Sequence, residues 1–232
     1  WKTFLKTMTH KKSIFITTDI APDSSIYEWA IEEGHQLYGK SLIDFQACQF
    51  DLPDQFDILF FYSKNAVKYF AEGLDSAQLA LVKQKLFGAI GSSTASEVKE
   101  VFGKEVQYDF DDYKDDVEAL NDLVKDKICL FPQAQTSRKT IEKALTDCIA
   151  FPIIVYQNLP DLTFVNPYPS DIIAFTSPLN VDAYLANNKI TTQHLVTIGQ
   201  TTASYLKEKY HLDSMVAYHP SEEGMLEVIK AL

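Results

Sequence analysis

What this 232-residue sequence lacks already excludes several classes of protein. It has only three cysteines, Cys48, Cys129 and Cys148, at no metal-binding or redox spacing, so we expect reduced thiols rather than a disulfide framework. Its apolar runs are far shorter than the roughly 20 residues needed to cross a bilayer. Residues 1–12 are mixed and basic, without the apolar stretch of a secretory signal. We therefore expect a cytoplasmic protein with no membrane partner.

The common catalytic motifs are also missing. The sequence has no G-x-x-x-x-G-K-[ST] loop, no G-x-G-x-x-G loop and no G-x-S-x-G elbow. Its five histidines are not spaced as metal ligands or as part of a catalytic triad. A D-D-x-x-D pattern at residues 111–115 has the chemistry to hold magnesium, but acidic residues at a helix start are also favoured by the helix dipole. We predict no metal and no cofactor.

Positive charge is scarce in this chain. The net charge is −11, and only one of the 21 basic residues is an arginine, Arg138. An acidic surface disfavours nucleic acid as a partner. A lone arginine is either chance in a lysine-biased sequence or a residue retained where a planar fork must bind a carboxylate or phosphate. Both explanations of Arg138 stay open at this point.

What the sequence does contain is two phrases that each occur twice. D-I-L-F-F-Y-S-K at residues 57–64 is similar to D-I-I-A-F-T-S-P at 171–178. A-I-G-S-S-T-A-S at residues 89–96 is similar to T-I-G-Q-T-T-A-S at 197–204, in the same order and at nearly the same separation. A repeat this long indicates two similar domains rather than a solenoid. A small ligand between such domains would contact matching loops of each.

Strand patterns and helix patterns alternate along the chain, which predicts parallel sheets covered by helices. Strands are expected at residues 13–18, 37–45, 57–62, 85–90, 106–108, 127–131, 149–156, 171–176, 194–198 and 214–218. Helices are expected at residues 22–33 (opened by Pro22), 65–71, 95–101, 114–124, 138–145, 179–187, 201–209 and 221–231.

The distribution of these units predicts a discontinuous domain. Two extra strand–helix units lie between the copies of the repeat, and one strand–helix–strand unit precedes the first copy. If each domain has about five strands, the N-terminal unit must join the C-terminal half. We predict two similar flavodoxin-like α/β domains, residues 1–44 with 158–232 and residues 47–154, joined by a two-stranded hinge at 45–46 and 155–157.

Polar or turn-forming residues follow six of the predicted strands. Ligands of open parallel sheets bind at the carboxyl ends of strands, where helix starts present free backbone N–H groups to anions. Serine and threonine are also ordinary helix caps, so a purely structural role stays open for any one of them. The six residues are Ser63, Gly91, Pro132, Ser177, Gly199 and Pro220.

Several of these phrases, taken together, resemble the uroporphyrinogen-III synthase family. Residues 175–181 are similar to its F-[TS]-S-P-x-x-V phrase, residues 198–203 to I-G-P-T-T-A, and residues 220–225 to P-[ST]-x-E-G-[LM]. Residues 131–145 resemble its P-x-x-x-x-x-R segment and residues 155–157 its V-Y-[QRE]. The chain departs from the family at three positions where a proline is frequent: after Gly91, after Gly199 and after Ser63.

The resemblance implies a cofactor-free, monomeric lyase of heme biosynthesis. Its substrate would be hydroxymethylbilane, a linear tetrapyrrole with carboxylate arms, received from hydroxymethylbilane synthase through a transient contact. Loss of the terminal hydroxyl and attack through the substituted position of the last ring would give a spiro intermediate, and closure would leave that ring inverted. Such a reaction depends on holding the linear substrate in the right geometry more than on strong acids or bases.

By the same resemblance, Tyr156 is the candidate catalytic residue, because it matches a family tyrosine near the departing hydroxyl. A tyrosine hydroxyl is protonated at neutral pH and can donate to a leaving group. The structural alternative is an aromatic plug at the domain crossing. Substrate binding is expected at Ser63, Lys64, Asn65, Ser93, Thr94, Arg138, Ser177, Pro178, Gly199, Thr201 and Thr202.

Two other functions fit the same residues. Two α/β domains with a double crossing also describe solute-binding proteins that close on a small anion, although those are usually exported. An inactive relative that has kept the fold is the other alternative.

Overall fold

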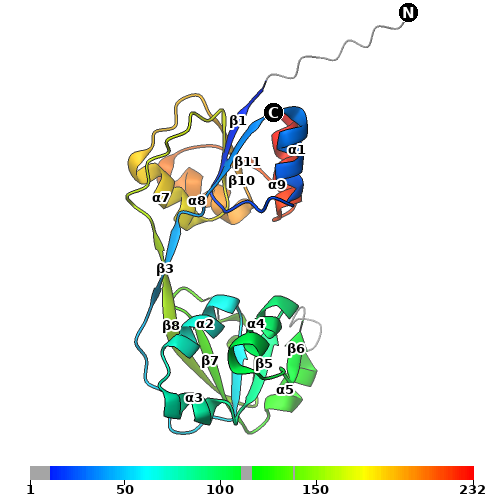
Figure 1. Ribbon diagram of the computed structural model, residues 1–232, viewed down its shortest axis with the longest axis vertical. Helices are drawn as coiled ribbons and strands as arrows, with labels where there is room; N and C mark the ends of the chain where they lie inside the picture. The colour runs from blue at the N-terminus through cyan, green and yellow to red at the C-terminus, as the bar shows by residue number, and fades with distance from the viewer. Residues whose placement is uncertain (1–10, 111–116, 138) are drawn as a thin grey trace, which may run out of the picture. The chain divides into compact units, whose positions relative to one another are not determined.

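The computed structural model describes residues 11–110, 117–137 and 139–232 (Figure 1). Arg138 and the D-D-x-x-D pattern therefore lie outside the described residues. Contacts between Cα atoms divide the chain into two compact units, Trp1–Asp44 with Leu159–Leu232, and Phe45–Asn158. Within the described residues, no helix is long and apolar enough to cross a membrane.

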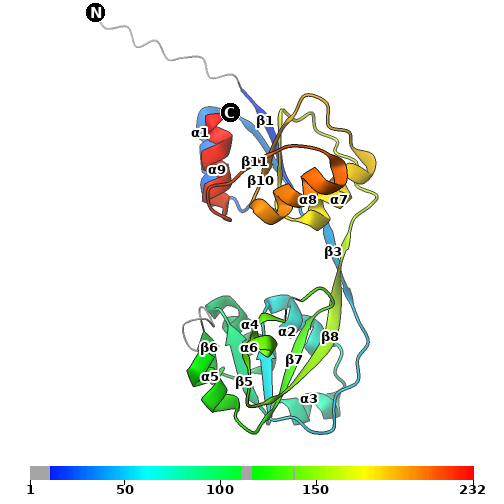
Figure 2. The same cartoon turned by 180° about the vertical axis from the view of Figure 1, so that it is seen from behind.

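The first unit contains a five-stranded parallel sheet in the order β11-β10-β9-β1-β2. Helices α1 and α9 pack together on one face of this sheet, and α7 and α8 pack together on the other (Figures 1 and 2). Numbered within the unit, the strand order is 2-1-3-4-5, which is the flavodoxin-like order. The elements are β1 (Ser13–Ile16), α1 (Ser25–Glu33), β2 (Gln36–Gly39), β9 (Ile172–Phe175), α7 (Pro178–Asn187), β10 (His194–Thr197), α8 (Gln200–Tyr210), β11 (Met215–Val216) and α9 (Glu222–Ala231).

The second unit contains a six-stranded sheet in the order β3-β8-β7-β4-β5-β6. Strands β4 to β8 pair in parallel, and α2 packs against α4. The elements are β3 (Ile43–Ala47), β4 (Ile58–Phe61), α2 (Lys64–Glu72), α3 (Ser76–Val82), β5 (Leu86–Ile90), α4 (Ser92–Phe102), β6 (Tyr108–Phe110), α5 (Val117–Val124), β7 (Ile128–Ala134), α6 (Thr140–Ala144) and β8 (Ile149–Pro160).

The two sheets share one spatial arrangement of strands, although the chain runs through them differently. The repeated phrases lie on β4 and β5 in one unit and on β9 and β10 in the other, with β6 or β11 beyond them. The opposite side of the sheet is β7 and β8 in the second unit, but β1 and β2 in the first. Those two strands follow the repeat in one unit and precede it in the other. The units are therefore related by a circular permutation, which accounts for the uneven distribution of strand–helix units in the sequence.

The predicted fold class, α/β with two similar parallel-dominated sheets, is confirmed. The second sheet adds a detail that the prediction did not contain. When β3 is left out and strands β4 to β8 are numbered 1 to 5 in chain order, the strand order of the second sheet is 3-2-1-4-5. The first sheet has the flavodoxin-like order 2-1-3-4-5 instead. This difference is the circular permutation expressed as strand numbers.

Some predicted elements are wrong. The strand expected at residues 37–45 is two strands in different sheets, β2 and β3, because the chain leaves the first unit there. The helix expected to open at Pro22 begins at Ser25 instead, because the Ser24 side chain accepts a hydrogen bond from the Tyr27 N–H and caps it. Helix α3 was not predicted.

Pro132 was expected directly after a strand but lies within β7, opposite Ile153 of β8. A proline inside a strand removes one ladder hydrogen bond. On the other side of β7, the pairing with β4 ends at Leu130, before the proline.

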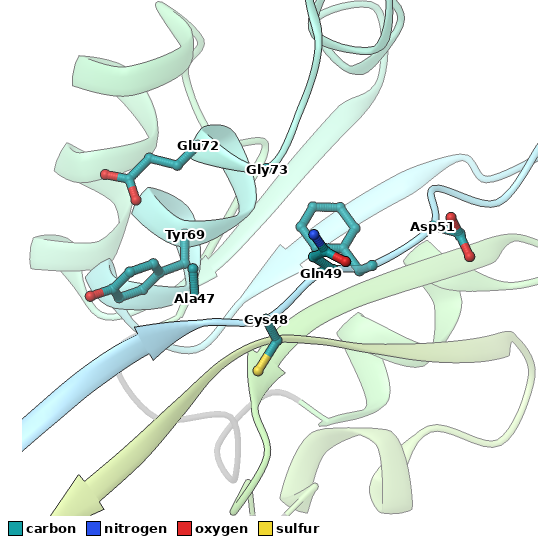
Figure 3. Close-up of a pocket in the computed structure, with 8 residues that line it drawn as sticks. Ala47, Cys48, Gln49, Asp51, Tyr69, Glu72 and Gly73 are labelled. Carbon is teal, nitrogen blue, oxygen red and sulfur yellow. The ribbon is translucent and has the colours of Figure 1, made fainter.

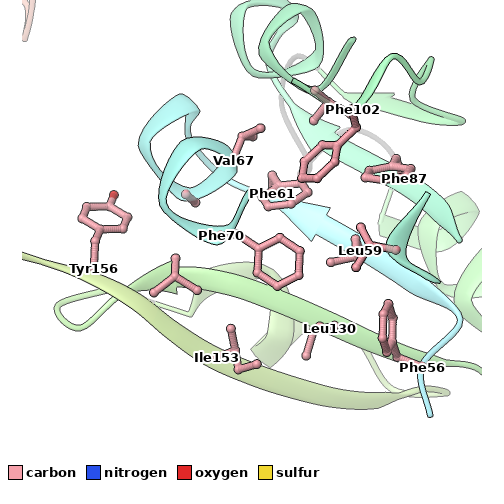
Figure 4. Packing of buried hydrophobic residues seen from close by; sticks show 14 residues of the cluster. Phe56, Leu59, Phe61, Val67, Phe70, Phe87, Phe102, Leu130, Ile153 and Tyr156 are labelled. Atoms are coloured by element: carbon pink, nitrogen blue, oxygen red, sulfur yellow. The ribbon is translucent and has the colours of Figure 1, made fainter. Parts of the chain in front are cut away.

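Phenylalanine rings fill the core of the second unit on the α2 and α4 side (Figure 4). Phe61 of β4 lies centrally, with Phe70 at a ring-centroid distance of 5.8 Å in an edge-on arrangement and Phe102 at 6.2 Å. Such aromatic pairs add to the stabilisation that comes from buried area alone. The rings hold α2 and α4 against the sheet.

Two strands carry the chain between the units. The Cys48 N–H donates to the Val155 carbonyl at 2.9 Å, and the Asp161 N–H donates to the Leu42 carbonyl at 2.8 Å. From Leu42 to Cys48 along β3, the hydrogen-bond partner on the other strand moves back from Asp161 to Val155, so β3 and β8 run antiparallel. The role of these strands as a hinge stays a prediction.

Asp182 of α7 connects the two helices on one face of the first sheet. Its carboxylate accepts hydrogen bonds from the hydroxyls of Tyr205 at 2.7 Å and Tyr210 at 2.8 Å, and from Lys209 Nζ at 2.8 Å. Burial acts to raise the pKa of Asp182, but the hydrogen bonds from Lys209 and the two tyrosines outweigh it and hold the pKa below its usual value. A carboxyl group with a lowered pKa stabilises the folded state only while it is ionised.

Replacing Asp182 with asparagine is expected to lower the free energy of unfolding at pH 7 by about 1 kcal/mol, allowing for solvent screening. The contribution is fully present above the ordinary aspartate pKa of 3.8 and is lost as the pH falls through the lower pKa of the folded state. Urea unfolding at neutral pH and at successively lower pH would show the difference shrinking. Asp213→Asn is the control, because Asp213 is 83% exposed and its ion pair with Lys207 lies at the surface. Equal losses in both variants would contradict the prediction.

Candidate functional site

Each unit places two helix starts side by side at the carboxyl edge of its sheet. Strands β4 and β5 are parallel neighbours followed by α2 and α4, and strands β9 and β10 are parallel neighbours followed by α7 and α8. The first helix of each pair is capped by serine. Ser63 Oγ accepts from the Ala66 N–H at 3.2 Å, and Ser177 Oγ accepts from the Asn180 N–H at 3.2 Å.

The second helix of each pair starts from a glycine. Gly91 precedes α4 and Gly199 precedes α8, and neither position supplies a side-chain acceptor for the helix. The first N–H groups of a helix have no partner within it, so these two starts present free donors and the positive end of the helix dipole. Gly91 has a φ of 80°, a conformation that favours glycine. Both starts suit an anion.

A threonine lies at the same place on each glycine-started helix. Thr94 of α4 and Thr202 of α8 are each 3% exposed. Neither hydroxyl donates to or accepts from another residue that the structure describes, and neither oxygen is fully enclosed by protein. A hydroxyl that is unpaired within the protein but not enclosed is available to bond to water or to a ligand.

The other predicted binding residues occupy the same helix starts. Lys64 and Asn65 are the first two residues of α2, and Pro178 is the first residue of α7. Ser93 and Thr201 are the second residues of α4 and α8, and both are exposed. The fold therefore gathers the candidates at the carboxyl edge of each sheet, with Arg138 outside the described residues.

Tyr156 lies on β8 and reaches the first helix start of its own unit. Its hydroxyl oxygen is 3.3 Å from Ser63 Oγ, and its side chain is 6% exposed. Its ring stacks on that of Tyr69 at a centroid distance of 5.4 Å and lies 6.0 Å from that of Phe45. Figure 4 shows the ring at the margin of the phenylalanine cluster. The packing fixes the ring, and the hydroxyl is held beside the Ser63 turn.

Sequence reasoning missed Tyr69, the stacking partner of Tyr156. Tyr69 is half-buried on α2, and its hydroxyl donates to the Phe45 carbonyl at 3.2 Å. The pairing of β8 with β3 brings Tyr156 to Phe45, and the packing of α2 brings Tyr69 to both. No spacing in the sequence encodes these contacts.

A second polar group lies on the other face of the same sheet and was also missed. The Tyr62 hydroxyl donates to Glu142 Oε2 at 2.9 Å, and Gln133 Nε2 donates to Glu142 Oε1 at 2.8 Å. Burial raises the pKa of Tyr62, and the adjacent Glu142 carboxylate raises it further, so the hydroxyl stays protonated. This group fixes α6 to the ends of β4 and β7.

A hollow of about 600 Å³ lies beside Tyr69, at the end of β3 (Figure 3). Two carboxylates, those of Asp51 and Glu72, border it, so it does not suit an anionic ligand. No cluster of three or more histidine, cysteine, aspartate or glutamate side chains in the described part of the chain is placed to hold a metal ion. The helix starts remain the places at which anions are best bound.

Comparison with known proteins identifies one family. The family model described as uroporphyrinogen-III synthase HemD matches residues 38–227. The crystal structure of uroporphyrinogen-III synthetase from Helicobacter pylori 26695 is similar, with a TM-score of 0.69, 22% identity, and coverage of 96% of this chain and 99% of that one. A mutant uroporphyrinogen III synthase from Thermus thermophilus has a TM-score of 0.49 and 16% identity, and the match covers 95% of this chain and 98% of that one. No curated protein matches the chain.

Proposed function

The chain belongs to the uroporphyrinogen-III synthase family, and we propose that its paired helix starts hold the carboxylate arms of the substrate while Tyr156 assists the leaving group. The protein is an enzyme of tetrapyrrole biosynthesis, a lyase that cyclises hydroxymethylbilane to uroporphyrinogen III. The last ring is inverted in this reaction. What has to be argued from this chain is how its own residues bind and orient such a substrate.

The observation that carries the binding proposal is the matched pair of threonine hydroxyls. Thr94 and Thr202 are each nearly buried, have no hydrogen-bond partner among the described residues, and lie beside free backbone N–H groups. Each such set of donors suits a carboxylate. Local donors of this kind allow a chain of net charge −11 to bind a polyanion. Ser63, Lys64, Asn65, Ser93, Arg138, Ser177, Pro178, Gly199 and Thr201 complete the proposed binding set.

Tyr156 is the proposed hydrogen-bond donor to the departing hydroxyl of the substrate. Ser63 Oγ lies 3.3 Å from the Tyr156 oxygen. When Ser63 donates to that oxygen, the tyrosine hydrogen is free for the substrate hydroxyl. The hydroxyl takes up this proton and leaves as water, and the N–H proton that the same pyrrole ring loses restores the tyrosine hydroxyl. The closely packed ring holds the donor in one place, as a reaction controlled by geometry requires.

The same proposal gives the two units separate roles. Residues 1–44 with 158–232 and residues 47–154 would act as two domains that move about the strands at 45–46 and 155–157, each binding part of the substrate. We also propose a cytoplasmic monomer that receives its unstable substrate from hydroxymethylbilane synthase. The three free cysteines support a reducing compartment, and light scattering would test the monomer.

A coupled assay tests the proposed function directly. Hydroxymethylbilane is made in situ by its synthase, with and without this protein, and the oxidised porphyrin isomers are separated by chromatography. The expected result is a shift from the type I isomer, which forms without the enzyme, to type III. Type I alone, from protein shown to be folded, would favour a small-anion binding protein or an inactive relative.

A further inference from the structure

Asn180 is a buried amide in the first turn of α7. It is 3% exposed, and every polar atom of its side chain is used. Its Nδ2 donates to Thr176 Oγ1 at 3.0 Å and to Ser177 Oγ at 3.1 Å, and its Oδ1 accepts from the Leu42 N–H at 3.0 Å. One side chain thus joins the turn after β9 to the backbone just before β3.

The contact with Leu42 fixes which way the amide faces. A backbone N–H can only donate, so the oxygen of the Asn180 side chain must point toward Leu42. The nitrogen must then point toward the hydroxyls of Thr176 and Ser177. Because the Leu42 carbonyl also accepts from the Asp161 N–H at 2.8 Å, this residue is held through both of its backbone polar groups.

Ser177 Oγ therefore accepts two hydrogen bonds from the same residue, from the backbone N–H of Asn180 at 3.2 Å and from its Nδ2 at 3.1 Å. A hydroxyl oxygen has two lone pairs and one hydrogen. With both lone pairs used, the hydroxyl can only donate, and its hydrogen has no acceptor in the described part of the chain. The equivalent turn of the second unit lacks this device, because Ala66 stands where Asn180 stands here.

We propose that Asn180 is a positioning residue that makes Ser177 an obligate hydrogen-bond donor, so that this turn selects a carboxylate acceptor. The inference rests on the proposed function, because the carboxylate would belong to a substrate arm. It goes beyond that function by assigning specificity to a residue that need not touch the substrate. The amide also makes the direction of the Ser177 hydroxyl depend on the Leu42 peptide next to the strand crossing.

Asn180→Asp tests this with little change of shape. The new carboxylate still accepts from Leu42, but its second oxygen now takes the Ser177 hydrogen. We expect the Kd for uroporphyrin, a stable macrocyclic polycarboxylate, to rise about tenfold in a fluorescence-quenching titration. The KM in the coupled assay should rise similarly, with kcat changing less. Gln193→Glu is the charge control, because it adds a negative charge at the amino end of β10 and keeps its hydrogen bonds as an acceptor.

The same substitution in a Ser177→Ala background separates positioning from charge. If Asn180 acts through Ser177, the loss caused by Asn180→Asp shrinks markedly in that background. An equal loss of uroporphyrin affinity in both backgrounds would overturn the inference, and so would a loss no larger than that of Gln193→Glu. A wild-type protein that does not bind uroporphyrin would also overturn it. Wild-type binding without type III formation would instead contradict the proposed function and leave the titrations to decide the role of Asn180.

Discussion

Replacing Tyr156 with phenylalanine is expected to lower kcat for type III formation by about 100-fold, the lower end of the effect of a positioned proton donor. The substitution keeps the ring that stacks on Tyr69 and removes one hydroxyl, whose contact with Ser63 is long at 3.3 Å. The free energy of unfolding should therefore change little. The coupled assay gives the rate, and urea unfolding gives the stability.

Tyr69→Phe is the matched control for this substitution. It removes a hydroxyl from the ring stacked directly on Tyr156, and that hydroxyl donates to the Phe45 carbonyl within the protein. Its rate should stay within about twofold of wild type, because exposed hydrogen bonds of this kind contribute little. Two variants with equally small losses would make Tyr156 an aromatic plug, and two with equally large losses would point to the stack rather than the hydroxyl.

The repeated phrases in the sequence were sufficient to locate the helix starts. Ser63 and Ser177 cap helices, and Gly91 and Gly199 begin helices without a side-chain cap. These positions follow from local rules, since a polar residue directly after a buried strand and before a helix pattern can hardly lie elsewhere. Local sequence rules predict a structural element correctly where the local preference of the residues and the tertiary structure agree.

Sequence reasoning did not find the contacts that depend on tertiary structure. Asn180 looked like an ordinary residue of a helix, and its importance comes from Leu42, far away in the sequence. Glu142 has no motif at all and is identified only by the Tyr62 and Gln133 side chains that bond to it. The strand at residues 37–45 was misjudged for a related reason, since nothing local to it indicates that the chain changes sheets.

The circular permutation shows why a repeat can be recognised while its surroundings differ. The repeated phrases occupy the central strands and the helices that follow them, and these parts are equivalent in both units. The flanking strands follow the repeat in the second unit, as β7 and β8, and precede it in the first unit, as β1 and β2. The proposed binding residues at the ends of the central strands are therefore duplicated, whereas Tyr156, on a flanking strand, has no counterpart in the repeat. The proposed binding edge therefore occurs once in each unit, whereas the proposed hydrogen-bond donor occurs once in the chain.

Replacing Thr94 or Thr202 with valine is expected to lower kcat/KM about tenfold each, and about 100-fold when both are replaced, if each hydroxyl binds a different carboxylate. Valine has nearly the same shape as threonine and lacks only the hydroxyl. Because neither hydroxyl has a partner among the described residues, its removal should leave the free energy of unfolding unchanged or raise it. The measurements are the coupled assay and urea unfolding.

The combination of lower activity with unchanged or higher stability makes this prediction specific. Removing a hydroxyl that stabilises the fold would lower both stability and activity. Removing a hydroxyl that only binds a ligand lowers activity alone. Thr191→Val is the control, because Thr191 is exposed near the amino end of β10 and bonds to Gln193. Full activity in the double variant would remove the helix starts from substrate binding and leave Tyr156 without the two edges that are proposed to orient its substrate.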